Sequence, residues 1–254
     1  MIVDGKQIAA ELEKEIKEKL KSPKTVHFVL FGKHPASEQF VALKSKVAEK
    51  LGITAITKTY PESTTTDEAG KIIENISGNS DGIVVQLPLP KRMDAKKILD
   101  AIPPEIDIDV LNEKTKKLFE EGKTDKIPPV ARAVSEILKK HDVDLKNKKI
   151  VILGNGPLVG QPVSAWLTRE KIAHTVNTDL HSADIIISGI GHPHFVTPDM
   201  VKDGVVLIDA GTSESGGKFV GDISPDCAAK SALFTPVPGG VGPVTVASLF
   251  LNLF

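Results

Sequence analysis

A lysine on the apolar side of an amphipathic segment is the first candidate for chemistry. Residues 36–51 read ASEQFVALKSKVAEKL, and apolar side chains recur there at helical spacing at Phe40, Leu43, Val47 and Leu51. Lys44 lies four residues after Phe40 and three before Val47, which predicts that it shares this stripe. A partly desolvated lysine can act as a general acid or base. Alternatively, its stem covers apolar surface while its ammonium reaches water.

A glutamine closes an apolar strand pattern further along the chain. Gln86 ends DGIVVQ (81–86), and Leu87-Pro88-Leu89-Pro90 follows it as a rigid, extended exit. A glutamine side chain offers both an acceptor and a donor, to a ligand or to a nearby lysine. It could equally satisfy the backbone of its own loop.

Two carboxylates stand two residues apart in IPPEIDIDVL (102–111). If this stretch is extended, Asp107 and Asp109 share one face and could accept hydrogen bonds from an amino-pyrimidine edge. They could equally form turns, the commoner use of aspartates in loops. The sequence leaves both uses open.

Glycines between a predicted strand and a predicted helix indicate a phosphate-binding loop. Gly154, Gly156 and Gly160 lie in VILGNGPLVGQPVSAWL, one residue longer than the usual dinucleotide fingerprint. Glycine permits a tight turn and close approach of a phosphate, and the N-terminus of the following helix favours an anion. A purely structural turn is the alternative.

The choice between NAD and NADP depends on residues around this loop. Asp179 follows the next predicted strand, where an acidic side chain binds ribose hydroxyls and repels a 2′-phosphate. Asn155 and Gln161 stand where an arginine could bind that phosphate. These residues favour NAD, although Asp179 could instead cap a helix.

Apolar runs alternate with helical patterns along the whole chain. This alternation predicts an α/β fold with a mostly parallel sheet and helices on its faces, repeated in two domains. We place the domains at 1–134 and 135–240, with a C-terminal helix at 241–254 that packs back on the first. The predicted strands are 26–32, 53–60, 82–86, 148–154, 174–178, 183–189 and 205–211, and the predicted helices of the first domain are 36–51 and 67–77.

Composition excludes several classes of protein. The chain has 254 residues, 41% hydrophobic content and a formal charge of −1, so it can build large cores and has no nucleic-acid footprint. Its one cysteine, Cys227, excludes an internal disulfide framework, and His192 and His194 have no third ligand nearby for a metal. Without a signal-peptide pattern or an apolar run long enough to span a bilayer, we expect a cytoplasmic protein with no membrane, nucleic-acid or metal partner.

Several motifs together resemble one family, the bifunctional methylenetetrahydrofolate dehydrogenase/methenyltetrahydrofolate cyclohydrolases. The resemblance covers nearly the full length, and VQLPLP and PVPGGVGPVT are its most specific parts. The motifs follow the family's order: DGKQIA, HPASEQFVALKSK, DGIVVQLPLP, the pair Asp107 and Asp109, GNGPLVGQP, GKFVGDI and TPVPGGVGPVT.

The resemblance implies a catalytic domain, a Rossmann-type domain that binds NAD or NADP, a cleft between them, and a homodimer. It implies oxidation of 5,10-methylenetetrahydrofolate, then hydrolysis to 10-formyltetrahydrofolate, a one-carbon donor for purine biosynthesis. Lys44 matches the catalytic lysine, Gln86 the glutamine that tunes it, and Asp109 the aspartate that holds the pterin. The implied substrate contacts are Phe40, Pro88, Pro238, Gly239 and Gly240. The implied cofactor contacts are Gly154, Asn155, Gly156, Val159, Gly160, Asp179 and Thr212.

The chain departs from the family pattern at a few of these positions. Phe40 replaces a tyrosine, Val110 replaces a glycine after Asp109, and Val130 lies where a hydroxyl is usual. These departures leave two alternatives open. One is a dehydrogenase with weak or lost cyclohydrolase activity, and the other is a folate- or nucleotide-binding protein with little turnover.

Overall fold

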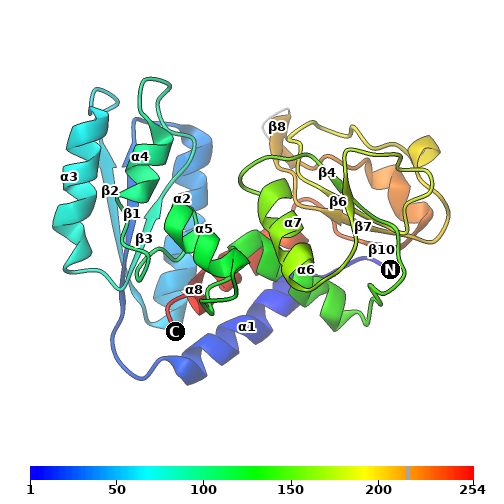
Figure 1. Cartoon of the computed structure of the whole chain (residues 1–254), viewed down its shortest axis with the longest axis horizontal. Helices are drawn as coiled ribbons and strands as arrows, with labels where there is room; N and C mark the ends of the chain where they lie inside the picture. Colours follow the sequence, from blue (N-terminus) through cyan, green and yellow to red (C-terminus); the bar gives the residue numbers. More distant parts are fainter. Residues whose placement is uncertain (216–217) are drawn as a thin grey trace. The chain divides into compact units, whose positions relative to one another are not determined.

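The computed structural model describes residues 1–215 and 218–254, and it separates the chain into two compact units (Figure 1). Unit 1 comprises Met1–Leu12 and Pro129–Ser248, and unit 2 comprises Glu13–Pro128 and Leu249–Phe254. Gly217, the first residue of the GKFVGDI motif, lies outside the described residues. Each unit contains its own parallel sheet.

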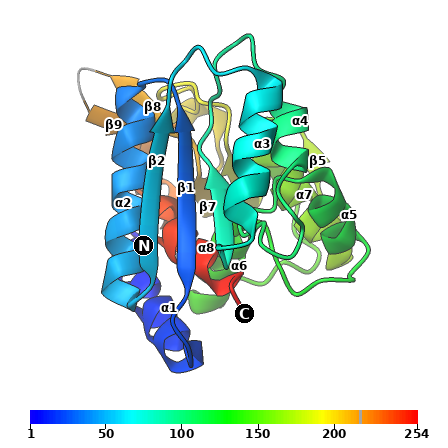
Figure 2. The same cartoon turned by 90° about the vertical axis from the view of Figure 1, so that its left-hand side faces the viewer.

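Unit 2 is built on a three-stranded parallel sheet in the order β2-β1-β3. Figure 2 shows helix α2 on one face of this sheet and α3 on the other. The elements are β1 (Thr25–Phe31), α2 (Pro35–Leu51), β2 (Thr54–Tyr60), α3 (Thr66–Ser77), β3 (Gly82–Val85), α4 (Ala95–Asp100) and α5 (Glu113–Glu120).

Local sequence explains where these helices begin and end. A capping box starts α3, because the Thr65 side chain accepts from the Glu68 N–H and the Glu68 carboxylate accepts from the Thr65 N–H. Helix α2 ends at Gly52, whose φ of 81° lies in the left-handed region that glycine adopts most easily. The strand β1 is almost wholly buried, so its apolar run forms the centre of the unit.

Unit 1 is built on a five-stranded parallel sheet in the order β10-β7-β6-β4-β5, and β8 pairs antiparallel with β9 beside it. Its elements, with the two helices that continue into unit 2, are α1 (Gly5–Lys19), α6 (Pro129–Lys140), β4 (Ile150–Leu153), α7 (Gly160–Arg169), β5 (Thr175–Val176), β6 (Ile185–Ser188), the 3-10 turn η1 (Pro198–Met200), β7 (Val205–Asp209), β8 (Ser213–Ser215), β9 (Lys218–Val220), the 3-10 turn η2 (Pro225–Ala229), β10 (Ser231–Phe234) and α8 (Val241–Leu251).

The connection between β5 and β6 is unusually short for a parallel crossover. Such connections generally need a dozen or more residues and contain a helix. Here residues 177–184, all of them described, pass from β5 to β6 across β4 without one. Leu180 and Ala183 fill the space instead, since both are buried in the cluster that covers this face of the sheet.

The structure confirms the α/β fold and the predicted strands and helices, with small changes at their ends. The strand predicted at 174–178 is confined to β5, because Asn177 has a left-handed φ of 53° and ends the extended stretch. The predicted apolar stripe of α2 is wrong at Leu43, which is 46% exposed. The buried face of this helix consists of Ser37, Val41, Ala48 and Leu51.

Candidate active site

Lys44 projects from the buried side of α2 in unit 2. It lies three residues after Val41 and four before Ala48, so it shares their face of the helix. Only 17% of its side chain is exposed. Its Nζ donates to Oε1 of Gln86 at 3.1 Å. The lysine is therefore held against the sheet instead of reaching freely into water.

Gln86 directly follows β3 and has a fixed orientation. Its backbone N–H donates to the Val29 carbonyl at 2.9 Å, which extends the ladder with β1 by one residue. Its side-chain Nε2 donates to the carbonyl of Leu87 at 2.8 Å, and this bond turns Oε1 towards Lys44. The Gln86 side chain thus binds both a nearby lysine and the backbone of its own loop.

The stretch that carries the two aspartates is not extended, because the chain bends at Ile108 and Asp109, and the two aspartates have different partners. Val110 has φ of 56°, so the chain turns immediately after Asp109. The Oδ2 of Asp109 lies 4.0 Å from Nζ of Lys44. Asp107 is fully buried and accepts from the N–H groups of Leu111 and Asn112. Asp107 is therefore a turn former, and Asp109 belongs to the lysine's surroundings.

Two residues that the sequence did not single out hold the loop that carries Asp109. The Nζ of Lys126 donates to the carbonyls of Pro104 and Glu105, at 2.8 and 2.6 Å. Burial lowers the pKa of Lys126, against the attraction of Asp107. Near the C-terminus, Nδ2 of Asn252 donates to the Ile108 carbonyl at 2.8 Å. Only the folded chain shows these long-range bonds.

The predicted substrate contacts of unit 2 lie near the Lys44 group, which consists of Lys44, Gln86 and Asp109. Phe40 lies one helical turn before Lys44 on α2 and is half-buried. Pro88 is exposed two residues after Gln86, and the Leu87–Pro88 peptide bond is cis. Both positions lie close along the chain to residues of the Lys44 group.

In unit 1 the glycine loop makes a tight turn from β4 into α7. Gly154 has φ of 98°, and a Cβ at Gly160 would lie 2.1 Å from the Gly154 carbonyl oxygen. A Cβ at Gly156 would meet nothing within 4 Å, so packing alone does not require glycine there. Helix α7 starts at Gly160 with no side-chain cap. The Gln161 N–H already donates to the Gly156 carbonyl at 3.0 Å and Pro162 has no N–H, so among the described groups at this helix start it is the Gly160 N–H that can meet an anion.

Asn177, which no sequence motif singled out, supports this loop. It follows β5 with φ of 53°, and its Oδ1 accepts from the Gly154 N–H at 2.7 Å. A left-handed Asn is common where a side chain bonds local backbone. Its position just after a predicted strand could have identified it, because ligand-facing residues of parallel sheets gather at strand ends.

Asp179 makes a turn of its own. It accepts from the N–H groups of His181 and Ser182, at 3.1 and 3.3 Å. The Ser182 hydroxyl also donates to it and, with these N–H groups, lowers its pKa. Its side chain is 54% exposed, and Lys149 lies 3.7 Å away. No helix follows Asp179 in residues 180–184, so the structure shows it as a turn former and not as a helix cap, with its carboxylate open to water.

The remaining predicted residues of unit 1 follow other strand ends. Val159 packs where a Cβ at Gly189 would stand, and Thr212 is exposed three residues after β7. The loop that contains Pro238, Gly239 and Gly240 follows β10. Gly5 at the start of α1 donates to the Gly239 carbonyl at 3.0 Å.

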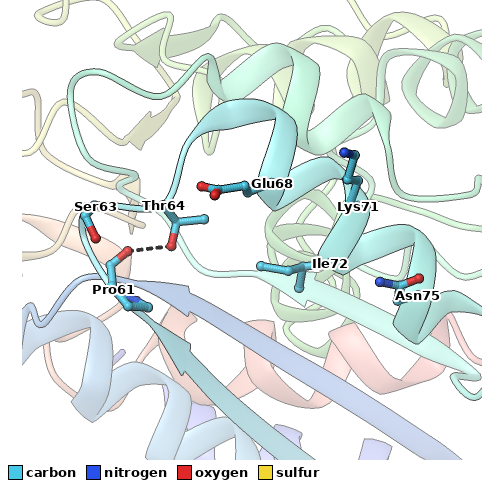
Figure 3. A pocket seen from close by; sticks show the side chains of 7 residues that line it. All are labelled: Pro61, Ser63, Thr64, Glu68, Lys71, Ile72 and Asn75. Carbon is cyan, nitrogen blue, oxygen red and sulfur yellow. Dashed lines mark hydrogen bonds between the residues drawn. The ribbon is translucent and has the colours of Figure 1, made fainter.

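Other hollows and histidines contribute no further site. A pocket of about 440 Å³ lies beside α3, and Figure 3 shows it between Pro61, Ser63 and Thr64 of the loop after β2 and side chains of the helix. It includes none of the predicted site residues.

Within the described ranges, no three His, Cys, Asp or Glu side chains gather as a metal site. His192 and His194 are both exposed. No helix in the described part of the chain has the length and apolar character needed to cross a membrane.

Comparison with known families covers both units. Residues 3–109 match the catalytic domain, and residues 128–254 the NAD(P)-binding domain, of tetrahydrofolate dehydrogenase/cyclohydrolase. The chain belongs to the tetrahydrofolate dehydrogenase/cyclohydrolase family. It is 37% identical to the bifunctional protein FolD of Nautilia profundicola, over 99% of this chain and 95% of that protein.

Solved structures of this family have the same fold. The bifunctional FolD enzyme from Campylobacter jejuni is 32% identical, with a TM-score of 0.93 over 100% of this chain and 96% of that one. The enzyme from Trypanosoma brucei, complexed with NADP and an inhibitor, is 31% identical with a TM-score of 0.93 over 100% and 95%. The predicted family and the two-domain α/β fold are confirmed. As a family member, the chain is a dehydrogenase and cyclohydrolase of tetrahydrofolate derivatives that uses a nicotinamide cofactor.

Proposed function

We propose that Lys44, Gln86 and Asp109 form the site where the methenyl carbon of 5,10-methenyltetrahydrofolate is hydrolysed. One observation carries this assignment: Nζ of Lys44 lies 3.1 Å from Oε1 of Gln86 and 4.0 Å from Oδ2 of Asp109. A mostly buried amine with two fixed oxygen neighbours has a defined place and direction for exchanging protons.

The hydrolysis needs proton transfers that such a lysine can assist. Water adds to the methenyl carbon, its proton must leave, and the C–N5 bond must break with a proton delivered to N5, which gives 10-formyltetrahydrofolate. Lys44 takes and returns protons in these steps. Gln86 fixes the ammonium through Oε1, and Asp109 accepts hydrogen bonds from the pterin. Phe40 and Pro88 supply apolar contact with the same substrate.

The oxidation of 5,10-methylenetetrahydrofolate needs the glycine loop of unit 1. When bound, the oxidised nicotinamide accepts the hydride that leaves the methylene carbon. The chain's task in this step is to hold donor and acceptor carbons close and in line. Gly154, Gly156 and Gly160 hold the pyrophosphate at the N-terminus of α7: Gly154 and Gly160 allow the tight turn, Gly156 leaves open space, and Gly160 offers its N–H. Asn155, Val159 and Thr212 are the further proposed contacts.

We assign the folate site to unit 2 and the cofactor site to unit 1, with Pro238, Gly239 and Gly240 as added substrate contacts. NAD is the proposed cofactor, because the exposed carboxylate of Asp179 follows β5 and would repel a 2′-phosphate. Replacing Asp179 with alanine should raise the KM for NAD and lower that for NADP. An unchanged ratio of the two would remove Asp179 from the site.

We also expect a homodimer in the cytoplasm that supplies one-carbon units for purine biosynthesis. Sedimentation of the purified protein measures its oligomeric state directly, and a monomer at micromolar concentration would contradict this expectation.

The proposed function is tested by mixing the purified protein with methylenetetrahydrofolate and either NAD or NADP. Reduced nicotinamide should form faster with NAD, and the methenyl absorbance should rise and then decay faster than in buffer alone. A methenyl signal that decays at the buffer rate would indicate a dehydrogenase that has lost hydrolysis. Ligand-induced stabilisation without nicotinamide reduction would indicate a binding protein.

A further inference from the structure

A buried carboxylate lies behind the cofactor loop of unit 1, outside every residue assigned above. Asp222 is fully buried. Its Oδ2 accepts from the Ser188 hydroxyl and from the Ile190 N–H, both at 2.8 Å. Its Oδ1 accepts from the His192 N–H at 2.9 Å. One side chain thus binds the end of β6 and two backbone groups of the segment that follows.

That segment, residues 189–192, packs directly against the glycine loop. The Gly189 N–H donates to the carbonyl of Leu153 at 3.0 Å. A Cβ at Gly189 would lie 2.3 Å from Cγ1 of Val159, and a Cβ at Gly154 would lie 2.8 Å from Cγ2 of Ile190. At these distances the two segments cannot move independently, so the position of one sets the position of the other.

A second buried carboxylate fixes Asp222 in turn. Asp209, at the end of β7, accepts from the N–H groups of Asp222 and Ile223, at 3.2 and 2.8 Å. Glycine is required where the two strand ends meet, since a Cβ at Gly211 would lie 2.1 Å from Cγ of Asp222. Asp209 and Asp222 are therefore both closely packed, and each is hydrogen-bonded to backbone N–H groups.

We infer that Asp222 is a positioning residue of the cofactor site, which acts by holding residues 189–192 against the glycine loop. The inference rests on the proposed placement of the cofactor at that loop. Asp222 itself is buried under the segment and does not touch the cofactor. Its effect is therefore on cofactor affinity, through the shape of the loop, and not on hydrolysis of the methenyl substrate, which needs no cofactor.

The test compares Asp222→Asn with Asp184→Asn in the full-length protein. The amide that replaces the carboxylate of Asp222 can accept at one atom only, so at least one bond to Ile190 or His192 is lost. Asp184 offers the same chemical change at the opposite end of β6, where it accepts from Lys202 and from the Lys149 N–H at 2.6 and 2.7 Å. For Asp222→Asn we expect the KM for the preferred nicotinamide cofactor to rise about 10-fold, with kcat within about 3-fold and hydrolysis within about 2-fold.

Asp184→Asn should leave the cofactor KM within about 2-fold. The inference is overturned if Asp222→Asn leaves the cofactor KM unchanged, lowers both activities in proportion, or shares its effect with Asp184→Asn. If Asp222→Asn fails to fold, Gly189→Ala tests the same link, because its methyl group would push residues 189–192 away from Val159. A cofactor KM unchanged by Gly189→Ala would then overturn the inference.

A third variant separates this inference from the proposed cofactor placement. Gly160→Ala puts a methyl group against the Gly154 carbonyl and must deform the glycine loop itself. If Gly160→Ala leaves the cofactor KM unchanged, the cofactor does not bind at this loop and the placement fails. If Gly160→Ala raises the KM and Asp222→Asn does not, the placement stands and only the inference fails.

Discussion

The Lys44 group of unit 2 and the glycine loop of unit 1 are built on opposite principles. The first depends on the functional groups of three side chains from α2, the end of β3 and the loop before α5. The second depends on positions that carry no side chain, at Gly154, Gly156 and Gly160, and on the Gly160 N–H at the start of α7. The first site supplies reactive side-chain groups, whereas the second supplies room for a ligand.

This difference predicts different sensitivities to substitution. In the Lys44 group, a change that keeps the shape and removes the functional group should abolish catalysis with little effect on folding. In the glycine loop, a single added methyl group should block the ligand although no functional group is lost. The following substitutions test that contrast, from the largest expected effect to the smallest.

Removing the lysine should have the largest effect. Lys44→Ala should lower hydrolysis of methenyltetrahydrofolate by about 10³-fold, because positioned proton transfer contributes on this scale. Hydride transfer should fall less, since it needs no proton transfer by this amine. The matched control is Lys46→Ala on the same helix, where the side chain is exposed. Hydrolysis at the parent rate in Lys44→Ala would remove the lysine from the mechanism.

Removing the lysine's acceptor should have the next largest effect. Gln86→Leu keeps the approximate size of the side chain but leaves Nζ of Lys44 without its partner at 3.1 Å. We expect hydrolysis to fall by about 10²-fold in steady-state assays, because the amine loses its fixed direction. Gln39→Leu, at an exposed position of α2, makes the same chemical change as a control. Equal rates in the two variants would mean that Gln86 serves only its loop.

Adding a methyl group at Gly156 should weaken cofactor binding without weakening the fold. Its Cβ would meet nothing within 4 Å, and its φ lies outside the left-handed region. The free energy of unfolding should therefore stay the same or rise by about 0.5 kcal/mol. The KM for the cofactor should rise about 10-fold, because the methyl group occupies the space through which a phosphate approaches. An unchanged KM would mean that this open space is not the phosphate site.

The smallest effect concerns stability and pH in unit 1. Burial raises the pKa of Asp209 to about 7, against the N–H donors that lower it, and Asp222 adds to the rise. Between the ordinary value of 3.8 and about 7, the folded state holds a proton that the unfolded state has released. Asp209 therefore contributes fully to stability below pH 3.8, and this contribution is lost as the pH rises through about 7.

Asp209→Asn cannot ionise and should remove this dependence. Unfolding by urea at a series of pH values should show the parent losing stability relative to the variant as the pH rises from about 4 to about 8. A difference between the two proteins that stays constant over this range would contradict the raised pKa. Asp184→Asn serves as a control, since its hydrogen bond with Lys202 lowers the pKa of Asp184 instead.

Sequence pattern predicted the sheets because their strands are short apolar runs bounded by breakers. The strands β1, β3, β6 and β7 are buried on both faces, and such runs are visible without any tertiary information. The same pattern failed at Leu43, because periodicity identifies a stripe but not which edge of the stripe meets the sheet. Of the predicted stripe, Leu51 is buried and Phe40 and Val47 are half-buried, while Lys44 shares the face of Val41 and Ala48.

The parts of both sites that depend on long-range contacts were not visible in the sequence. The chain bends at Ile108 and Asp109 and has a left-handed φ at Val110, a conformation that is rare for a β-branched residue, so the pattern could not predict its course. Asn177 and Asp222 act through bonds to Gly154 and Ile190, which are distant along the chain. The motifs could therefore indicate which residues do chemistry, and only the fold could show which residues hold them.

The most direct test of the contrast between the two sites measures both activities in Lys44→Ala and Gly156→Ala. We predict a crossed result: the ratio of hydrolysis to hydride transfer falls steeply in Lys44→Ala, and it rises in Gly156→Ala when the cofactor concentration is below KM. A parallel fall of both activities in the two variants would contradict the account, because it would mean that side-chain chemistry and cofactor space do not lie in separable sites.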